Sequence, residues 1–109
     1  MAGIDALLKE MVKSGASDLH MVPGLPPTLR LKGDLVPTKH GQLTHQINEK
    51  LFFEMMTPQQ MKRLQSTLEL DMAYEIQGLA RFRCNYFYQV RGISAVFRQI
   101  PADIKALDQ

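Results

Sequence analysis

Four arginines gather in the last third of the chain, and their side chains are the ones best suited to binding chemistry. They fall between Gln77 and Ala102, a stretch without any Asp or Glu: Arg81, Arg83, Arg91 and Arg98. A guanidinium group presents a planar fork of donors that can grip two oxygens of a phosphate or a carboxylate at once. Salt-bridged outer faces usually alternate positive and negative residues. The missing acids therefore favour a surface that accepts an anion, and the alternative is a plain solvated face.

Two strands are predicted in this stretch, because apolar residues occupy every second position. The residues predicted to face the core are Phe82, Cys84, Tyr86, Tyr88, Ile93, Ala95 and Phe97. A two-residue loop at Val90 and Arg91 joins the strands into an antiparallel hairpin and pairs Tyr88 with Ile93. Cys84 is then expected to be a small buried side chain rather than a reactive thiol.

The same register places Arg83 directly opposite Arg98 on the other face of the hairpin, with Arg81 two residues further along. Like charges opposite each other in a sheet destabilise it by roughly 0.2 to 1 kcal/mol. The pairing therefore predicts an anionic partner for Arg83 and Arg98. Arg91, at the hairpin turn, is expected to be exposed and dispensable.

Other candidate residues give weaker signals. Asp18 and His20 share one face of a short strand, an arrangement that can serve acid–base catalysis or metal binding. Because no nucleophile or third ligand accompanies them in a spaced motif, a structural role is favoured. His40 and His45 lie in or beside a polar loop and are expected to be solvated. The sequence contains no GxxxxGK[ST], GxGxxG, HExxH or GxSxG motif, so it predicts neither a metal site nor an enzyme complete in itself.

Length and composition indicate one folded domain. The chain has 109 residues, of which 45% are hydrophobic and 22% charged, the usual balance of a globular protein. No apolar run approaches the roughly 20 residues that span a bilayer. One cysteine and a net charge of +2 fit a reducing compartment and give no basic excess for nucleic acid. We therefore expect a soluble, cytoplasmic protein.

The remaining segments predict both helices and strands. In chain order they are a helix within residues 1–15, a strand around Leu19 and Met21, strands at Thr28–Lys32 and Asp34–Thr38, helices capped by Thr44 and Thr57, and a strand at Leu70–Ile76. Thr57, Pro58 and Gln60 form a capping box, and the helix after it is expected to bury Leu64 and Leu68. Together the elements predict a single α+β domain.

Several motifs occur in an order that is specific to one family. They are ASDLH at Ala16–His20, Pro26–Pro27, LRL at Leu29–Leu31, Gly33, Asp71, RFRCN at Arg81–Asn85, Gly92 and FRQIP at Phe97–Pro101. Over essentially the whole chain, this series resembles the N-terminal domain of type IV pilus retraction ATPases, the PilT-like branch of the secretion ATPase superfamily. The resemblance implies that residues 1–109 form a PAS-like domain, an antiparallel sheet backed by helices. It also implies a following RecA-like ATPase core, which is absent from this chain.

The resemblance further implies a regulatory and assembly role in a motor for twitching motility. Such a domain couples ATP binding and hydrolysis in the core to domain movement, and packs against the cores of its own and neighbouring subunits in a homohexamer. By position, Arg83 and Arg98 would contact the nucleotide phosphates, with Arg81 as a third member. The complete protein would use ATP and Mg²⁺, with neither bound by this domain alone. It would lie in the cytoplasm, peripheral to the inner membrane, where it meets the pilus platform protein.

Two other functions fit a domain of this kind. A PAS-like small-molecule sensor would need an internal cavity, whereas the apolar residues here predict a filled core. A strand-based RNA reader would need aromatic rings on the outer face, as a stacking platform. The predicted register turns Phe82, Tyr86 and Tyr88 inward and leaves only Phe87 beside the arginines, so we expect no nucleic-acid partner.

Overall fold

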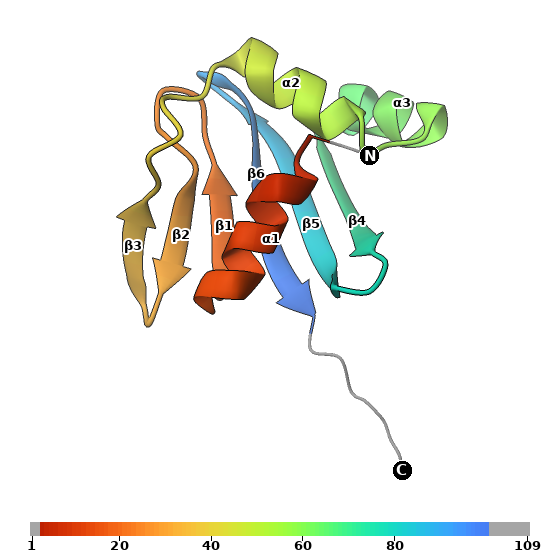
Figure 1. Ribbon diagram of the computed structural model, residues 1–109. Coiled ribbons are helices and arrows are strands. Elements are labelled where there is room, and N and C mark those ends of the chain that lie inside the picture. Colours follow the sequence, from red (N-terminus) through yellow and green to blue (C-terminus); the bar gives the residue numbers. More distant parts are fainter. Residues whose placement is uncertain (1–2, 101–109) are drawn as a thin grey trace.

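The computed structural model describes residues 3–100, which form a six-stranded antiparallel sheet with three helices (Figure 1). The elements are α1 (Asp5–Ser14), β1 (Asp18–Met21), β2 (Thr28–Leu31), β3 (Asp34–Pro37), α2 (His45–Phe53), α3 (Pro58–Thr67), β4 (Glu69–Ile76), β5 (Ala80–Gln89) and β6 (Gly92–Ile100). The strand order is β3-β2-β1-β6-β5-β4, so β1 and β6 lie side by side at the centre. The predicted α+β class, an antiparallel sheet backed by helices, is confirmed.

The ends of the helices follow from local sequence chemistry. Gly15 ends α1 in the left-handed conformation, with a φ of 77°, which glycine adopts without the steric penalty of a Cβ atom. At α3, the Thr57 hydroxyl accepts a hydrogen bond from the Gln60 backbone N–H (3.2 Å). The Gln60 side chain accepts one in return from the Thr57 backbone N–H (2.9 Å). The predicted helix stop and capping box are both confirmed.

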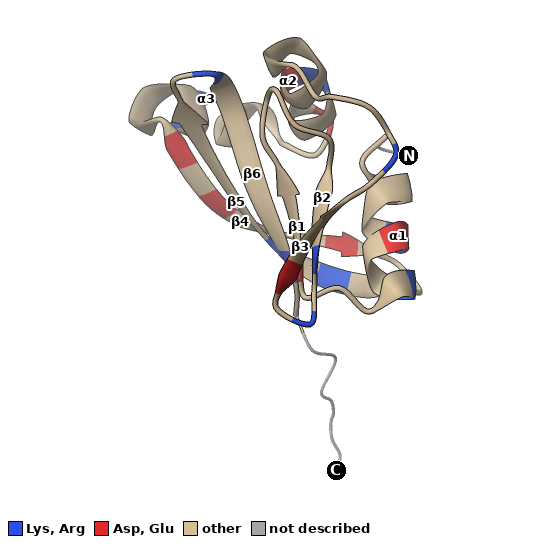
Figure 2. Cartoon of the chain, turned by 90° about the vertical axis from the view of Figure 1, so that its left-hand side faces the viewer, with Lys and Arg blue, Asp and Glu red and all other residues tan. Residues whose placement is uncertain are grey.

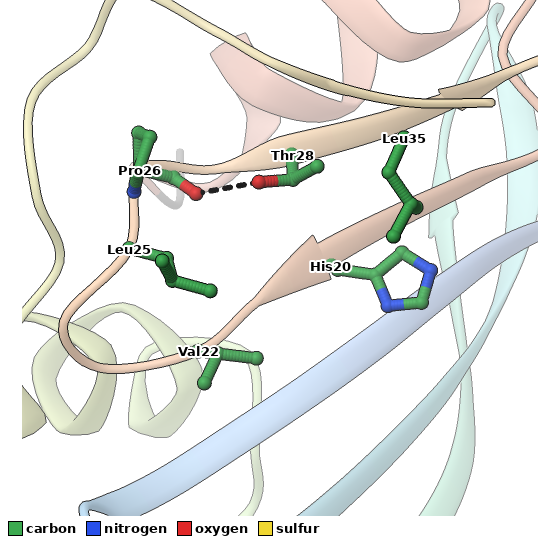
Figure 3. A pocket seen from close by; sticks show the side chains of 6 residues that line it. All are labelled: His20, Val22, Leu25, Pro26, Thr28 and Leu35. Atoms are coloured by element: carbon green, nitrogen blue, oxygen red, sulfur yellow. Dashed lines mark hydrogen bonds between the residues drawn. The ribbon is translucent and has the colours of Figure 1, made fainter.

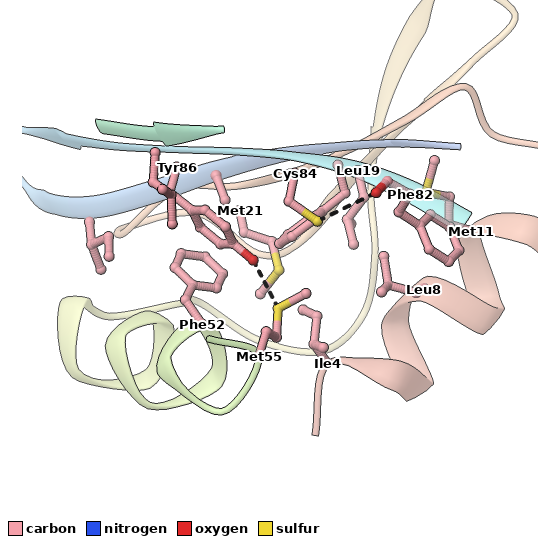
Figure 4. Close-up of a cluster of buried hydrophobic side chains, with 14 of the residues drawn as sticks. Ile4, Leu8, Met11, Leu19, Met21, Phe52, Met55, Phe82, Cys84 and Tyr86 are labelled. Carbon is pink, nitrogen blue, oxygen red and sulfur yellow. Dashed lines mark hydrogen bonds between the residues drawn. The ribbon is translucent and has the colours of Figure 1, made fainter. Parts of the chain in front are cut away.

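Three aromatic rings form the centre of the hydrophobic core, between the sheet and the helices (Figure 4). The ring centroid of Phe52 in α2 lies 5.2 Å from that of Tyr86 and 5.8 Å from that of Phe97. Tyr86 and Phe97, on β5 and β6, complete the triangle at 5.9 Å. All three side chains are fully buried, and the Tyr86 hydroxyl donates a hydrogen bond to the sulfur of Met55 (3.1 Å). Phe82 is also fully buried, so these aromatic rings are turned away from the outer face, as predicted.

Cys84 lies in the same core and should be chemically inert in the folded protein. Burial raises the pKa of the Cys84 thiol to about 12, so the reactive thiolate is scarce at neutral pH. We expect Cys84 to resist a thiol-specific disulfide reagent under native conditions and to react fully once urea unfolds the chain. Rapid labelling of the folded protein would contradict its placement in the core.

One predicted core residue lies at the surface instead. Leu68 is 58% exposed, whereas Leu64, one turn earlier in α3, is fully buried. The reason is the helix stop: the Leu68 N–H donates to the Leu64 carbonyl (2.8 Å), and Leu68 adopts a left-handed φ of 66°. This turn leads the chain into β4 and takes the Leu68 side chain off the apolar stripe.

His45 was predicted to be solvated, but it accepts a hydrogen bond from a distant strand. Its Nδ1 accepts a hydrogen bond from the Ile93 N–H (3.1 Å), which ties the start of α2 to the start of β6. Gly92 makes this contact possible, because a Cβ atom there would lie 2.6 Å from His45 Nδ1. The contact brings together residues 48 positions apart, which is why the sequence around the loop did not reveal it.

Candidate functional site

A row of charged residues crosses four neighbouring strands on the sheet face opposite the core. Asp18 of β1 lies directly between Arg30 of β2 and Arg98 of β6, and Arg98 lies directly opposite Arg83 of β5. Basic and acidic residues gather at the lower end of the sheet in Figure 2. The predicted register of the β5–β6 hairpin is confirmed, including the pairing of Arg83 with Arg98 and of Tyr88 with Ile93.

Both arginines of the predicted pair have carboxylate partners, so the expectation of uncompensated positive charge was wrong. Arg98 Nε donates to Asp18 Oδ1 at 2.8 Å. Arg83 donates twice to Asp71, from Nε to Oδ1 (3.3 Å) and from Nη2 to Oδ2 (2.8 Å). The partners come from the neighbouring strands β1 and β4, and Asp18 precedes Arg98 by 80 residues. A count of charges along the sequence therefore missed them.

The Arg83–Asp71 pair lies at the surface, and this makes it exchangeable. Hydrogen bonding to Arg83 lowers the pKa of Asp71, while the same carboxylate raises the pKa of Arg83. The two side chains are 67% and 45% exposed. Solvent-exposed pairs of this kind contribute little to stability. An anionic ligand can therefore share Arg83 with Asp71 or displace this carboxylate at low cost.

The two arginines border a shallow hollow of about 230 Å³ that is also lined by Asn85 and Val96. Within residues 3–100, the protein forms no hydrogen bond with either terminal nitrogen of Arg98 or with Nη1 of Arg83. These N–H groups, together with the Asn85 amide, are the donors that a phosphate or carboxylate group needs. The hollow can bind an oxyanion by charge-assisted hydrogen bonds.

The other two arginines lie outside this hollow. Arg81 is on the same face as Arg83 but is paired with Ile100 of β6 and with Glu75 of β4. Arg91 lies in the turn at the other end of the hairpin, exposed as predicted, with its guanidinium against Gly24. The structure thus brings together Arg83 and Arg98 and leaves Arg81 at the edge of the site.

No protein-family model matches the chain, but individual proteins do. The type IV pilus retraction ATPase PilT of Pseudomonas aeruginosa is 41% identical over 106 residues, which cover 97% of this chain and 31% of PilT. The type IV pilus ATPase PilU of the same organism is 30% identical, over 96% of this chain and 28% of PilU. The crystal structure of the pilus retraction motor PilT with bound ADP matches with a TM-score of 0.85 and 31% identity, over 96% of this chain and 31% of that one. The chain is homologous to the N-terminal part of PilT.

The homology to PilT confirms the family that the ASDLH, RFRCN and FRQIP motifs indicated. The six-stranded sheet with its helices is the fold of the PilT N-terminal domain. The chain spans about a third of the length of PilT and slightly less of PilU. Within residues 3–100, no three His, Cys, Asp or Glu residues are grouped so as to hold a metal ion. No helix in this range has the length and apolar character needed to cross a bilayer.

In this PilT homologue, His20 follows Asp18 by two residues in β1 and lines a separate, mostly apolar pocket (Figure 3). The pocket measures about 190 Å³, and its other lining residues are Val22, Leu25, Pro26, Thr28 and Leu35. The Nε2 atom of His20 is buried and has no hydrogen-bond partner among the described residues. Asp18 and His20 are not hydrogen-bonded to each other there; Asp18 binds arginines instead. The arrangement offers no acid–base pair.

The burial of His20 makes stability depend on pH. Burial lowers the pKa of His20 below its ordinary value of 6.5; Asp18 opposes this shift, and Arg30 and Arg98 add to it. Between the lowered pKa and 6.5, the unfolded chain binds the proton and the folded chain does not. The contribution of neutral His20 to stability is therefore present above about pH 6.5 and is lost as the pH falls toward the lowered pKa.

We expect urea unfolding midpoints to show this loss between about pH 7.5 and about pH 5. The comparison with His20→Leu isolates the contribution, because the other histidines titrate in both proteins. The leucine variant should lose less stability on acidification than the wild type. Equal losses in the two proteins would show that His20 does not cause the dependence.

Proposed function

We propose that this chain is the N-terminal regulatory and assembly domain of a type IV pilus retraction ATPase. In this role, Arg83 and Arg98 contact the phosphates of a nucleotide held by a RecA-like core. The observation that carries the proposal is the pair of guanidinium groups on adjacent strands, with outward donor N–H groups that the described part of the protein leaves unused. Homology supports a nucleotide phosphate as the anion, because PilT of Pseudomonas aeruginosa is a retraction ATPase and a similar PilT crystal structure contains bound ADP.

The proposed chemistry is electrostatic, since the residues that line the hollow offer positioned positive charge. Hydrogen bonds between charged groups contribute about 1.5 to 3 kcal/mol each. The exposed Arg83–Asp71 pair contributes little to stability, so exchanging Asp71 for a phosphate oxygen costs little. Arginines brought to a triphosphate also neutralise the charge that develops during hydrolysis.

This contact couples the nucleotide to domain movement. With a triphosphate in the core, Arg83 and Arg98 hold this domain against the nucleotide and favour a closed arrangement. Loss of the terminal phosphate removes part of the contact and lets the domain move away, because a ligand shifts a conformational equilibrium only through contacts that differ between the states. Arg81, further from the hollow, contributes as a third positive charge.

The proposal includes the assembly in which the domain acts. Residues 1–109 form the first domain of a longer chain, whose core binds ATP and Mg²⁺ and supplies the hydrolytic machinery. Six subunits form a ring in the cytoplasm, with this domain packed against the cores of its own and neighbouring subunits. The ring works at the inner-membrane platform protein of the pilus and drives twitching motility.

Hydrolysis of ATP by the complete ATPase tests the proposed role of the arginine pair. We expect the Arg83→Ala and Arg98→Ala enzymes to assemble normally and to hydrolyse ATP much more slowly than the wild type. Wild-type turnover in both variants would exclude the role.

A further inference from the structure

Asp18 is a buried carboxylate within an otherwise exposed charged row, and this calls for a physical reason. The residue is only 5% exposed. Removing a charge from water is costly unless the charge is paired and hydrogen-bonded. Each oxygen of Asp18 meets a different arginine: Oδ1 lies 2.8 Å from Arg98 Nε, and Oδ2 lies 3.2 Å from Arg30 Nε. Both oxygens of the carboxylate therefore have an arginine partner.

The bond to Asp18 fixes the direction of the Arg98 side chain. That side chain is 68% exposed, and Asp18 is the one hydrogen-bond partner it has within residues 3–100. An arginine without such a partner samples many rotamers and loses that freedom when it binds a ligand. Because Asp18 binds Nε, the two terminal nitrogens at the outer end of the Arg98 guanidinium stay available to a ligand.

Arg30 keeps Asp18 in place. It binds the second oxygen of Asp18, and its own Nη1 donates to the Gly33 carbonyl (3.2 Å) in the turn between β2 and β3. Arg30 is thereby anchored at two points. The carboxylate held between Arg30 and Arg98 cannot turn to cover the terminal nitrogens of Arg98 without giving up the contact with Arg30.

We propose that Asp18 is a positioning residue of the anion site: it holds Arg98 by Nε and presents the terminal N–H groups of Arg98, beside those of Arg83, to a phosphate group. Arg30 supports this arrangement through the second oxygen of Asp18. The inference rests on the proposed function for its ligand, but the orientation of Arg98 can be measured without any ligand. Asp18 also brings a negative charge close to the site, so substituting it has two opposing effects on anion binding.

The first measurement uses the 109-residue chain and the NMR signal of the Arg98 Nε–H group. Hydrogen bonding to a buried carboxylate slows the exchange of this proton with water. In Asp18→Asn we expect its exchange to accelerate about 10-fold or more, because the charged acceptor is lost. Glu75→Gln removes the same charge from the same face, makes no hydrogen bond with Arg98, and should leave the signal unchanged. An unaltered Arg98 signal in Asp18→Asn would overturn the inference.

The second measurement uses ATP hydrolysis by the complete ATPase. We expect Asp18→Asn to raise the KM for ATP about 5-fold, because Arg98 must now be ordered when the nucleotide binds. Glu75→Gln should keep the KM within about 2-fold of the wild type, and any change should be toward tighter binding. A lower KM in Asp18→Asn would mean that Asp18 competes with the nucleotide, and would overturn the positioning role.

Two further variants keep the outcomes distinct. Arg30→Gln removes only the partner of the second Asp18 oxygen, and it replaces Asp18→Asn as the test if that variant does not fold. We expect a smaller acceleration of Arg98 N–H exchange and a smaller rise in KM than in Asp18→Asn. No change in either quantity would overturn the role of Arg30. Arg98→Ala reports on the proposed function itself: if it leaves turnover and KM unchanged, the phosphate contact is wrong, whereas the Arg98 signal in Asp18→Asn still decides whether Asp18 orients the side chain.

Discussion

Alanine at Arg98 or at Arg83 should lower ATP turnover by the complete ATPase about 100-fold or more, since removing one preformed charge-stabilising donor commonly costs about 100- to 1,000-fold. The two side chains lie opposite each other across β5 and β6 and border one hollow. They would therefore act on the same phosphate groups. We expect the double variant to be little worse than either single variant, because groups that act as a unit are not additive. Steady-state hydrolysis at saturating ATP measures the effect.

Two control variants separate the arginine contact from a general loss of charge. Arg91→Ala removes the same charge at the far end of the same hairpin, where the side chain is exposed, and should retain wild-type turnover. Arg98→Lys keeps the charge but loses the planar fork, and should fall between the alanine variant and the wild type. A deficit in Arg91→Ala as large as that in Arg98→Ala would attribute the effect to net charge rather than to the site.

Turn length and the alternation of apolar residues predict part of the site from the sequence. Apolar residues occupy every second position of both strands, and the turn at Val90 and Arg91 has two residues. Together these features allow one register for the hairpin, in which Arg83 lies opposite Arg98. The same reasoning also reaches Asp71. The apolar residues of β4 alternate with Asp71, which puts the Asp71 carboxylate on the face that carries Arg83, and the three-residue connection from Ile76 to Ala80 keeps this face in register with β5.

Asp18 and Arg30 could not be assigned to the site in the same way. Asp18 lies on β1, which pairs with β6, and Arg30 lies on β2, on the other side of β1, because the strand order is β3-β2-β1-β6-β5-β4. The pairing of β1 with β6 brings together segments about 80 residues apart, and no turn or period specifies it. The long-range pairing also explains the wrong expectation about charge. The arginine-rich stretch has no acid of its own in the sequence, and the fold supplies one from each side.

Removing the Phe97 ring should destabilise the domain by about 3 to 5 kcal/mol, the usual cost of truncating a buried aromatic side chain. Phe97 is fully buried, with its ring centroid 5.8 Å from Phe52 of α2 and 5.9 Å from Tyr86 of β5. In Phe97→Ala, a cavity would replace the ring at the point where the helical layer meets the centre of the sheet. Small domains are stable by only about 5 to 15 kcal/mol. The substitution should therefore remove a large fraction of the total stability.

Urea unfolding followed by circular dichroism measures this loss, with Val90→Ala as the matched control. Val90 lies on the same hairpin but is fully exposed, so its truncation should change stability by less than about 0.5 kcal/mol. A loss below about 1 kcal/mol in Phe97→Ala would contradict the packing of α2 on β6. Phe97 and Arg98 are consecutive residues of one strand, one pointing into the core and the other into the hollow. The burial of Phe97 thus fixes the backbone that directs Arg98 outward, and the stability of the core and the geometry of the anion site depend on the same two strands.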